Sequence, residues 1–298
     1  MDSLDSMSQI IDLGPTAQVK KPFRTQLLKW IGNKQRFAEE IIGVFPDDYG
    51  TYFEPFLGSG AVLGTLAPEE GSASDAFGPL IEIFVTLKSE PELLKLWYRQ
   101  RWERMSHDSR QAVYEDVKAS YNRSPNGADL LFLSRSCYGG VVRFRKTDGY
   151  MSTPCGAHEP ISPDSFSHRV DVWSKRVQGT TFAQLDFADA MRSAKAGDII
   201  YCDPPYSNSQ TILYGAQAFS IERLFEEIAL CKARGVYIAL SIDGSKRSGA
   251  LICDVQTPDG LFESQVLVNC GRSMLRRFQM SGESLEGEVV SDRLLLTY

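Results

Sequence analysis

The tetrapeptide Asp203-Pro204-Pro205-Tyr206 combines the residue types that can hold a planar exocyclic amine. The lone pair of such an amine is delocalised into its ring, so an acceptor carboxylate and a backbone carbonyl must bond the two hydrogens and favour a tetrahedral nitrogen. Asp203 and the carbonyl of Pro204 can accept these bonds, and Tyr206 can stack on the ring. Asp-Pro-Pro alone is also typical of a rigid turn. Because the motif follows the apolar run 199–202, which predicts a buried strand, we interpret all four residues as catalytic.

A glycine turn lies earlier in the chain, at residues 54–60, EPFLGSG. Glycine lets the backbone approach a ligand closely and adopt a positive φ. The segment lacks the third glycine of a dinucleotide fingerprint and the Lys-Ser or Lys-Thr of a phosphate-binding loop, so a phosphate-free adenosyl ligand fits better. A simple strand-to-helix turn has the same pattern. The predicted ligand contacts of this turn are Glu54, Phe56, Gly58 and Gly60.

Two further positions suit a nucleoside ligand. Asp75 ends a second strand candidate, where its carboxylate can accept both ribose hydroxyls. A lone aspartate there more often caps a helix, so its interpretation depends on the preceding glycine turn. The segment LKWIGNK, residues 28–34, places Trp30 and two lysines ahead of the first strand candidate. Trp30 can stack on a nucleoside or close over it, with core packing as the alternative.

Composition restricts the class of protein. The chain has 298 residues, of which 43% are hydrophobic, so it can form a large core, and its net charge of -6 excludes a uniformly basic surface but not a local basic patch. Its six cysteines form no C-x-x-C pair and it has three histidines, so we expect no metal site. The apolar runs are too short to span a bilayer, which predicts a soluble cytoplasmic protein.

Strand and helix candidates alternate, which predicts an α/β fold with a doubly wound, mostly parallel, Rossmann-like sheet. Ligands of such a sheet bind beyond the carboxyl ends of its strands, where each motif lies. Residues 1–20 are predicted to be a flexible leader, residues 21–90 and 180–298 the catalytic domain, and residues 91–179 an inserted, mainly helical module. The strand candidates are 51–56, 181–183, 198–202, 236–242 and 294–298, and the helix candidates are 34–44, 61–66, 80–87 and 221–233.

Together these motifs resemble those of the Dam-like DNA adenine-N6 methyltransferases, in the order found in that family. The resemblance covers roughly residues 24–298 and comprises LKWIGNK (28–34), EPFLGSG (54–60), SD (74–75), QLDF (184–187), DPPY (203–206) and DRLLLTY (292–298). It implies S-adenosyl-L-methionine as the cofactor and site-specific methylation of adenine N6 in double-stranded DNA, with the base flipped into the DPPY pocket. The implied cofactor contacts are Trp30, Lys34, Asp75, Asp186 and Asp203, beside the glycine turn.

The inserted module would then recognise the target. Residues 133–143 resemble the family's recognition segment, which implies that Tyr138 wedges into the duplex and that Arg143 reads a guanine edge. The run from Arg135 to Lys146 holds four basic residues and no acidic one, which favours DNA over an ordinary solvated face. The predicted DNA contacts are Lys29 and Arg143 to bases, Arg145 and Lys146 to phosphates, and Arg135 and Tyr138.

Three positions depart from the family pattern. Asn33 replaces the second glycine of the family's G-G-K, and residues 76–79 lack the usual asparagine after the acidic residue, with Gly78 among them. Both bear on cofactor binding. Gly139 replaces the asparagine expected after Tyr138, which bears on the recognised sequence.

Other functions remain open at this stage. The same tetrapeptide can hold cytosine N4 or an RNA adenine, and a homologue without activity would still bind DNA. A phosphotransferase is disfavoured because the phosphate-loop lysine is absent. The partners that the resemblance implies are double-stranded DNA and a cognate restriction endonuclease, in a bacterial or phage nucleoid.

Overall fold

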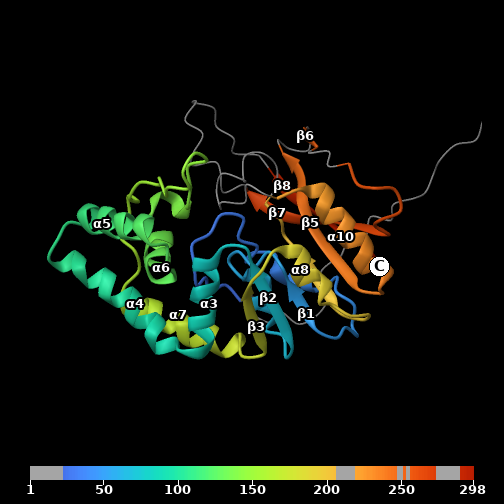
Figure 1. Cartoon of the computed structure of the whole chain (residues 1–298), viewed down its shortest axis with the longest axis horizontal. Helices are drawn as coiled ribbons and strands as arrows, with labels where there is room; N and C mark the ends of the chain where they lie inside the picture. The colour runs from blue at the N-terminus through green and yellow to red at the C-terminus, as the bar shows by residue number, and fades with distance from the viewer. Residues whose placement is uncertain (1–22, 206–218, 247–250, 253–255, 273–288) are drawn as a thin grey trace, which may run out of the picture.

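A computed structural model describes residues 23–205, 219–246, 251–252, 256–272 and 289–298 (Figure 1). Tyr206 and the predicted leader, residues 1–20, lie outside these described residues.

The strands of the described residues form one sheet with the order β3-β2-β1-β4-β5-β8-β7, and β6 pairs with β5. All neighbours from β3 to β5 are parallel, whereas β8 runs antiparallel to β5 and β7. This arrangement confirms the predicted α/β fold with a mostly parallel sheet. The strands are β1 (Tyr52–Glu54), β2 (Gly71–Asp75), β3 (Thr180–Gln184), β4 (Ile199–Cys202), β5 (Tyr237–Lys246), β6 (Leu251–Ile252), β7 (Ser264–Arg272) and β8 (Val289–Leu296).

Both faces of the sheet are covered, as the apolar sequence of β4 requires. Ile199 and Tyr201 face one hydrophobic cluster, while Ile200 and Cys202 face a second. The first cluster contains side chains of helices α1 to α7, and the second contains side chains of α8 and α10. The helices are α1 (Ala38–Ile42), α2 (Ala61–Leu66), α3 (Gly78–Ser89), α4 (Pro91–Glu103), α5 (Arg110–Arg123), α6 (Gly127–Ser136), α7 (Pro163–Arg176), α8 (Phe187–Arg192) and α10 (Ile221–Ala233), with the 3₁₀ turns η1 (Arg104–Ser106) and η2 (Tyr138–Gly140).

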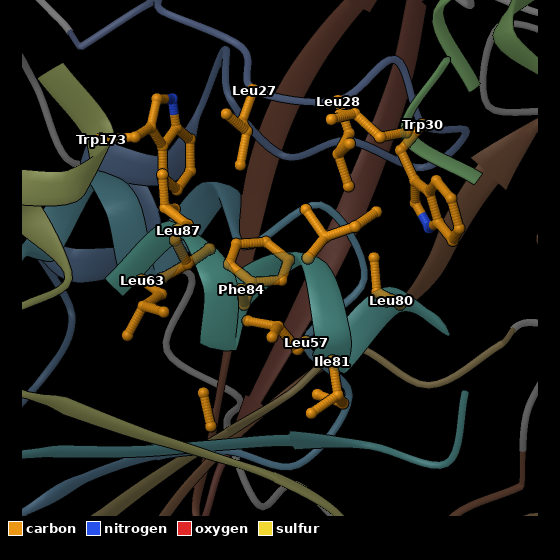
Figure 2. Packing of buried hydrophobic residues seen from close by; sticks show 14 of the residues in the cluster. Leu27, Leu28, Trp30, Leu57, Leu63, Leu80, Ile81, Phe84, Leu87 and Trp173 are labelled. Atoms are coloured by element: carbon orange, nitrogen blue, oxygen red, sulfur yellow. The ribbon is translucent and has the colours of Figure 1, made fainter. Parts of the chain in front are cut away.

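Helices α4 to α7 lie between β2 and β3 in the chain and gather on one side of the molecule, opposite α10 and β5 (Figure 1). Their buried side chains are continuous with the core beneath the sheet. Figure 2 shows Phe84 of α3 between Leu87 and Leu57, with Trp173 of α7 and Leu27 close by. The edge of Trp173 meets the Phe84 ring at 6.3 Å between centroids.

The predicted elements agree with the structure at α2 and α10, which have the expected bounds. The first helix was predicted from Lys34 but begins at Ala38, because residues 34–37 form a turn in which the Phe37 N–H donates to the Lys34 carbonyl at 3.1 Å. Helix α8 and strands β6 and β7 were not predicted. Among the described residues, no helix is long and apolar enough to cross a membrane, and no three metal-ligating side chains cluster.

Candidate active site

A cavity of about 280 Å³ opens at the carboxyl ends of β1 to β4. The strand order reverses direction between β1 and β4, which is the switch point where open α/β sheets bind ligands. The wall brings together most predicted ligand contacts from distant parts of the sequence. They are Trp30, Lys34, Glu54, Phe56, Gly58, Asp75, Asp186, Asp203, Pro204 and Pro205.

Asp203 follows the last residue of β4 and forms an ion pair with Lys34 at 3.1 Å between Oδ1 and Nζ. The side chains are 18% and 6% exposed, so the pair is shielded from water. The ammonium of Lys34 offsets the negative charge of the carboxylate and fixes its position at the cavity wall, where it can accept hydrogen bonds. Pro204 and Pro205 continue the wall with fixed φ angles.

The glycine turn needs glycine at two positions. Gly58 and Gly60 have φ angles of +48° and +64°, in the left-handed region. A Cβ on Gly60 would lie 3.0 Å from the Phe84 ring, and one on Gly58 would lie 3.5 Å from Trp30 Nε1. The turn therefore packs tightly on α3 and lies in ordinary contact with Trp30. Gly60 packs on Phe84 and is not among the residues that line the cavity, so the structure supports a role in shaping the turn, and its predicted ligand contact stays a prediction.

Asp75 ends β2 and ties this turn to the sheet. Gly58 N–H donates to Asp75 Oδ2 at 3.1 Å, and Phe77 N–H donates to Oδ1 at 3.0 Å. Burial raises the pKa of Asp75, and these backbone hydrogen bonds oppose the rise. Each carboxylate oxygen keeps a second lone pair, so Asp75 can still accept from a ligand in the cavity.

Glu54 is the most buried carboxyl group of the cavity, at 3% exposure. Its Oε2 accepts from the Tyr52 hydroxyl at 2.6 Å and from Leu63 N–H at 2.9 Å. Burial raises its pKa to about 8, and the negative charge of Asp203 adds to the rise. Glu54 is thus held in place from β1 and α2, and its charge depends on its surroundings.

Three aromatic rings form one wall of the cavity. Phe56 stacks on Phe187 at 5.2 Å between centroids, and Phe219 meets both rings edge-on. Such rings offer a flat apolar surface to a planar ligand. Phe187 adjoins the predicted Asp186 in sequence, but Phe219 had no signal because it precedes α10 in an irregular segment.

Residues 30–248 match the model of the D12 class N6 adenine-specific DNA methyltransferases, which is more than half of the chain. The chain belongs to this family. It is 26% identical over 227 residues to a DNA adenine methylase of Vibrio cholerae, covering 72% of this chain and 79% of that protein. It is 26% identical over 240 residues to Type II methyltransferase M1.LlaDCHI of Lactococcus lactis, covering 76% and 84%. It is 27% identical over 233 residues to the DNA N-6-adenine-methyltransferase of Escherichia phage P1, covering 75% of this chain and 30% of that protein.

In this D12 methyltransferase, the predicted recognition segment runs from the last turn of α6 through η2 into an irregular ribbon. Tyr138 is 45% exposed, and Arg143 and Lys146 are also exposed. The ribbon is closed by a bridge between Phe144 and Met151. Arg145 pairs with Asp148 at 2.7 Å and stacks over Tyr150, so its guanidinium already has partners on the ribbon.

Arg135 was predicted to contact DNA, but the structure of this methyltransferase buries its side chain. It is 4% exposed, and its guanidinium donates to the Leu27 carbonyl at 2.6 Å. Desolvation lowers its pKa to about 10. A buried arginine bonded to the main chain positions the 25–27 segment, and we remove it from the proposed interface.

Lys29 lies against the recognition turn of the methyltransferase. A Cβ on Gly140 would be 2.8 Å from Lys29 Cβ, so the two backbones are close. Burial and then the positive charges of Arg135 and Arg169 lower the pKa of Lys29. Lys29 and η2 therefore present one continuous surface, although they are far apart in sequence.

Proposed function

We propose that this chain binds S-adenosyl-L-methionine in the cavity and transfers its methyl group to N6 of adenine in double-stranded DNA. The observation that carries the proposal is the Asp203 carboxylate, held by buried Lys34 at the switch point of the sheet and followed by the rigid Pro204 and Pro205. That arrangement gives a planar amine a fixed acceptor beside a ligand cavity.

The chemistry of the cavity wall fits the cofactor. S-adenosyl-L-methionine carries a planar adenine, a ribose, an ammonium, a carboxylate and a positively charged sulfonium. The aromatic wall suits the adenine, Asp75 suits the ribose hydroxyls, and Lys34 suits the carboxylate. Asp203 supplies negative charge for the cationic groups, and a bound cation would favour the charged form of Glu54, whose pKa is about 8 in the folded chain. The glycine turn offers no phosphate-loop lysine, which agrees with a ligand that lacks phosphates.

The chain's own residues contribute positioning and hydrogen bonding. The cofactor supplies a methyl group made electrophilic by the sulfonium. Asp203 and the Pro204 carbonyl accept hydrogen bonds from the two amine hydrogens and draw the nitrogen toward a tetrahedral geometry, so that its lone pair can attack the methyl carbon in line. As the N–C bond forms, the C–S bond breaks and the sulfur leaves as a neutral thioether, and the methylated nitrogen then releases one proton. Tyr206, which lies outside the described residues, is proposed to stack on the flipped base.

We propose residues 91–179 as the target-recognition module. Tyr138 is the proposed wedge, and Arg143 and Lys29 are the proposed base contacts. Arg145 and Lys146 are the proposed phosphate contacts. The exposure of Tyr138, Arg143 and Lys146 supports these roles. A cognate restriction endonuclease is a candidate partner because one relative is named a Type II methyltransferase. Relatives from bacteria and a phage support a role at the nucleoid.

The test is Asp203→Ala, compared with Asp203→Asn. Loss of the Asp203 carboxylate should reduce methyl transfer by at least roughly 10²–10³-fold, while folding and most of the DNA affinity persist. Asp203→Asn keeps a carbonyl acceptor and should retain more activity than the alanine variant. Transfer is measured with labelled cofactor, and the product is digested to nucleosides. Near-normal turnover of Asp203→Ala would reject the mechanism, and N4-methylcytosine in the digest would reject the acceptor.

A further inference from the structure

Helices α8 and α10 are joined at their N-terminal ends by a two-pronged ion pair. Asp186 caps α8 by accepting from Ala188 N–H at 3.0 Å, and Arg223 lies in the first turn of α10. The two guanidinium nitrogens of Arg223 donate to the two oxygens of Asp186 at 3.0 and 2.6 Å. A pair of parallel hydrogen bonds fixes the orientation of both side chains, which a single contact does not.

The same guanidinium also contacts the aromatic wall. It lies 4.9 Å from the centroid of the Phe187 ring, within the range of a cation–π interaction. Phe187 stacks on Phe56 with an interplanar angle of 25°, so a displacement of one ring would disturb the other. Asp186, Phe187 and Phe56 line the cavity, whereas Arg223 does not. Arg223 therefore supports the cavity wall from behind.

We infer that Arg223 is a positioning residue for the cofactor: it holds Asp186 and Phe187 in the arrangement that receives the adenine ring of S-adenosyl-L-methionine. This inference rests on the proposed function. A prearranged wall loses less conformational entropy when the ligand binds. Because this wall is proposed to contact the adenine ring rather than the reacting methyl group, its interactions stabilise the bound ground state and the transition state equally. Their loss therefore raises KM for the cofactor and leaves kcat unchanged.

A purely electrostatic role for Arg223 predicts the opposite result. Removing its positive charge would leave Asp186 unneutralised beside a cationic ligand, and the ligand would then bind more tightly. The sign of the change in affinity thus separates positioning from charge compensation.

Arg192 provides a matched control. Arg192 lies in α8 and connects it to α10 through an ion pair with Glu227. It also pairs with Asp189 of its own helix at 3.2 Å. Arg192 does not line the cavity and has no described contact with the aromatic wall. Its substitution loosens the same two helices without releasing Phe187.

The experiment measures binding of S-adenosyl-L-methionine by titration calorimetry and, separately, kcat and KM for DNA methylation. Arg223→Gln should bind the cofactor roughly tenfold more weakly, given the size of exposed ion pairs and cation–π contacts. Its KM should rise by the same factor while kcat stays near that of the wild type. Arg223→Lys keeps the positive charge but cannot form the two parallel hydrogen bonds to Asp186, so it should recover part of the affinity. Arg192→Gln should bind the cofactor like the wild type.

Unchanged or tighter binding by Arg223→Gln would overturn the inference, as would an equal loss in Arg192→Gln. If Arg223→Gln does not fold, Arg223→Lys must still bind more weakly than the wild type. Failure of the wild-type chain to bind S-adenosyl-L-methionine would reject the proposed function and this inference with it, whereas wild-type binding with normal Arg223 variants rejects the inference alone.

Discussion

Lys34 and Asp203 pair at the edge of a cavity where water is largely excluded. Burying two charges costs free energy that their attraction recovers only with good geometry, and loss of one partner leaves the other uncompensated. Such a pair is a poor means of stabilising a fold. Its location beside the proposed amine site gives it a chemical use, because a carboxylate that must accept hydrogen bonds has to stay charged.

Glu54 makes stability depend on pH. Its pKa is about 8 in the folded chain and 4.5 in the reference state, so between these values the native state holds a proton that the unfolded state has lost. The contribution is complete below pH 4.5 and is lost as the pH rises to 8. The free energy of unfolding should fall by about 1.4 kcal/mol per pH unit in this range on account of this group.

The matched variant is Glu54→Gln, whose side-chain carbonyl can accept from Tyr52 and Leu63 as Oε2 does. Urea unfolding at several pH values from 5 to 8 gives the difference between the two proteins and cancels the other titrating groups. The wild type should lose stability relative to Glu54→Gln as the pH rises. Parallel profiles would show that Glu54 titrates normally.

At the scale of elements, the 29–34 segment connects the proposed DNA surface with the cavity. Lys29 contacts the recognition turn, Trp30 lines the cavity beside Gly58, and Lys34 holds Asp203. A change in how η2 packs on Lys29 should therefore alter the proposed DNA surface, at one end of this segment.

Gly140→Ala tests the packing of η2 against Lys29. Its φ is +71°, and the added Cβ would lie 2.8 Å from Lys29 Cβ, so η2 and Lys29 must separate. Specific DNA binding should weaken roughly tenfold, on the scale of one lost base contact, while cofactor affinity is unchanged. Fluorescence anisotropy and calorimetry measure the two. Gly149→Ala is the control, since Gly149 has a similar φ of +67° but nothing within 4 Å. Equal losses in both variants would assign the effect to backbone strain.

Local signals predicted the elements that carry them. α10 has a capping serine, Ser220, ahead of an amphipathic run, and its bounds were predicted correctly. β7 was missed because, among the described strands, it pairs with β8 alone and mixes polar residues with buried Val266 and Val268. The motifs located most of the cavity wall, but the Lys34–Asp203 and Arg223–Asp186 pairs join distant segments, and no local pattern specifies such contacts. Arg135 was misplaced because a basic run does not reveal which member is buried.

At the scale of the whole molecule, the shared hydrophobic core indicates that the described residues fold as one cooperative unit. The sequence suggested an inserted module, yet Tyr98 and Phe132 of its helices belong to the same buried cluster as Tyr52 of β1 and Leu294 of β8. The N-terminal segment strengthens this connection. Three consecutive carbonyls, of Thr25, Gln26 and Leu27, accept hydrogen bonds from Trp173, Arg169 and Arg135.

Unfolding should therefore occur in a single transition. In a Trp30→Phe background, the fluorescence of Trp97, Trp102 and Trp173 reports on the helices α4 and α7, while far-UV circular dichroism reports on the whole chain. Because the helices and the sheet share one cluster, the two signals should give the same urea midpoint and slope. Arg169→Gln removes the 2.9 Å hydrogen bond to the Gln26 carbonyl and should lower both midpoints equally. Fluorescence that changes well before the circular dichroism, in either protein, would mean that residues 91–179 unfold independently and that the shared core contributes little to their stability.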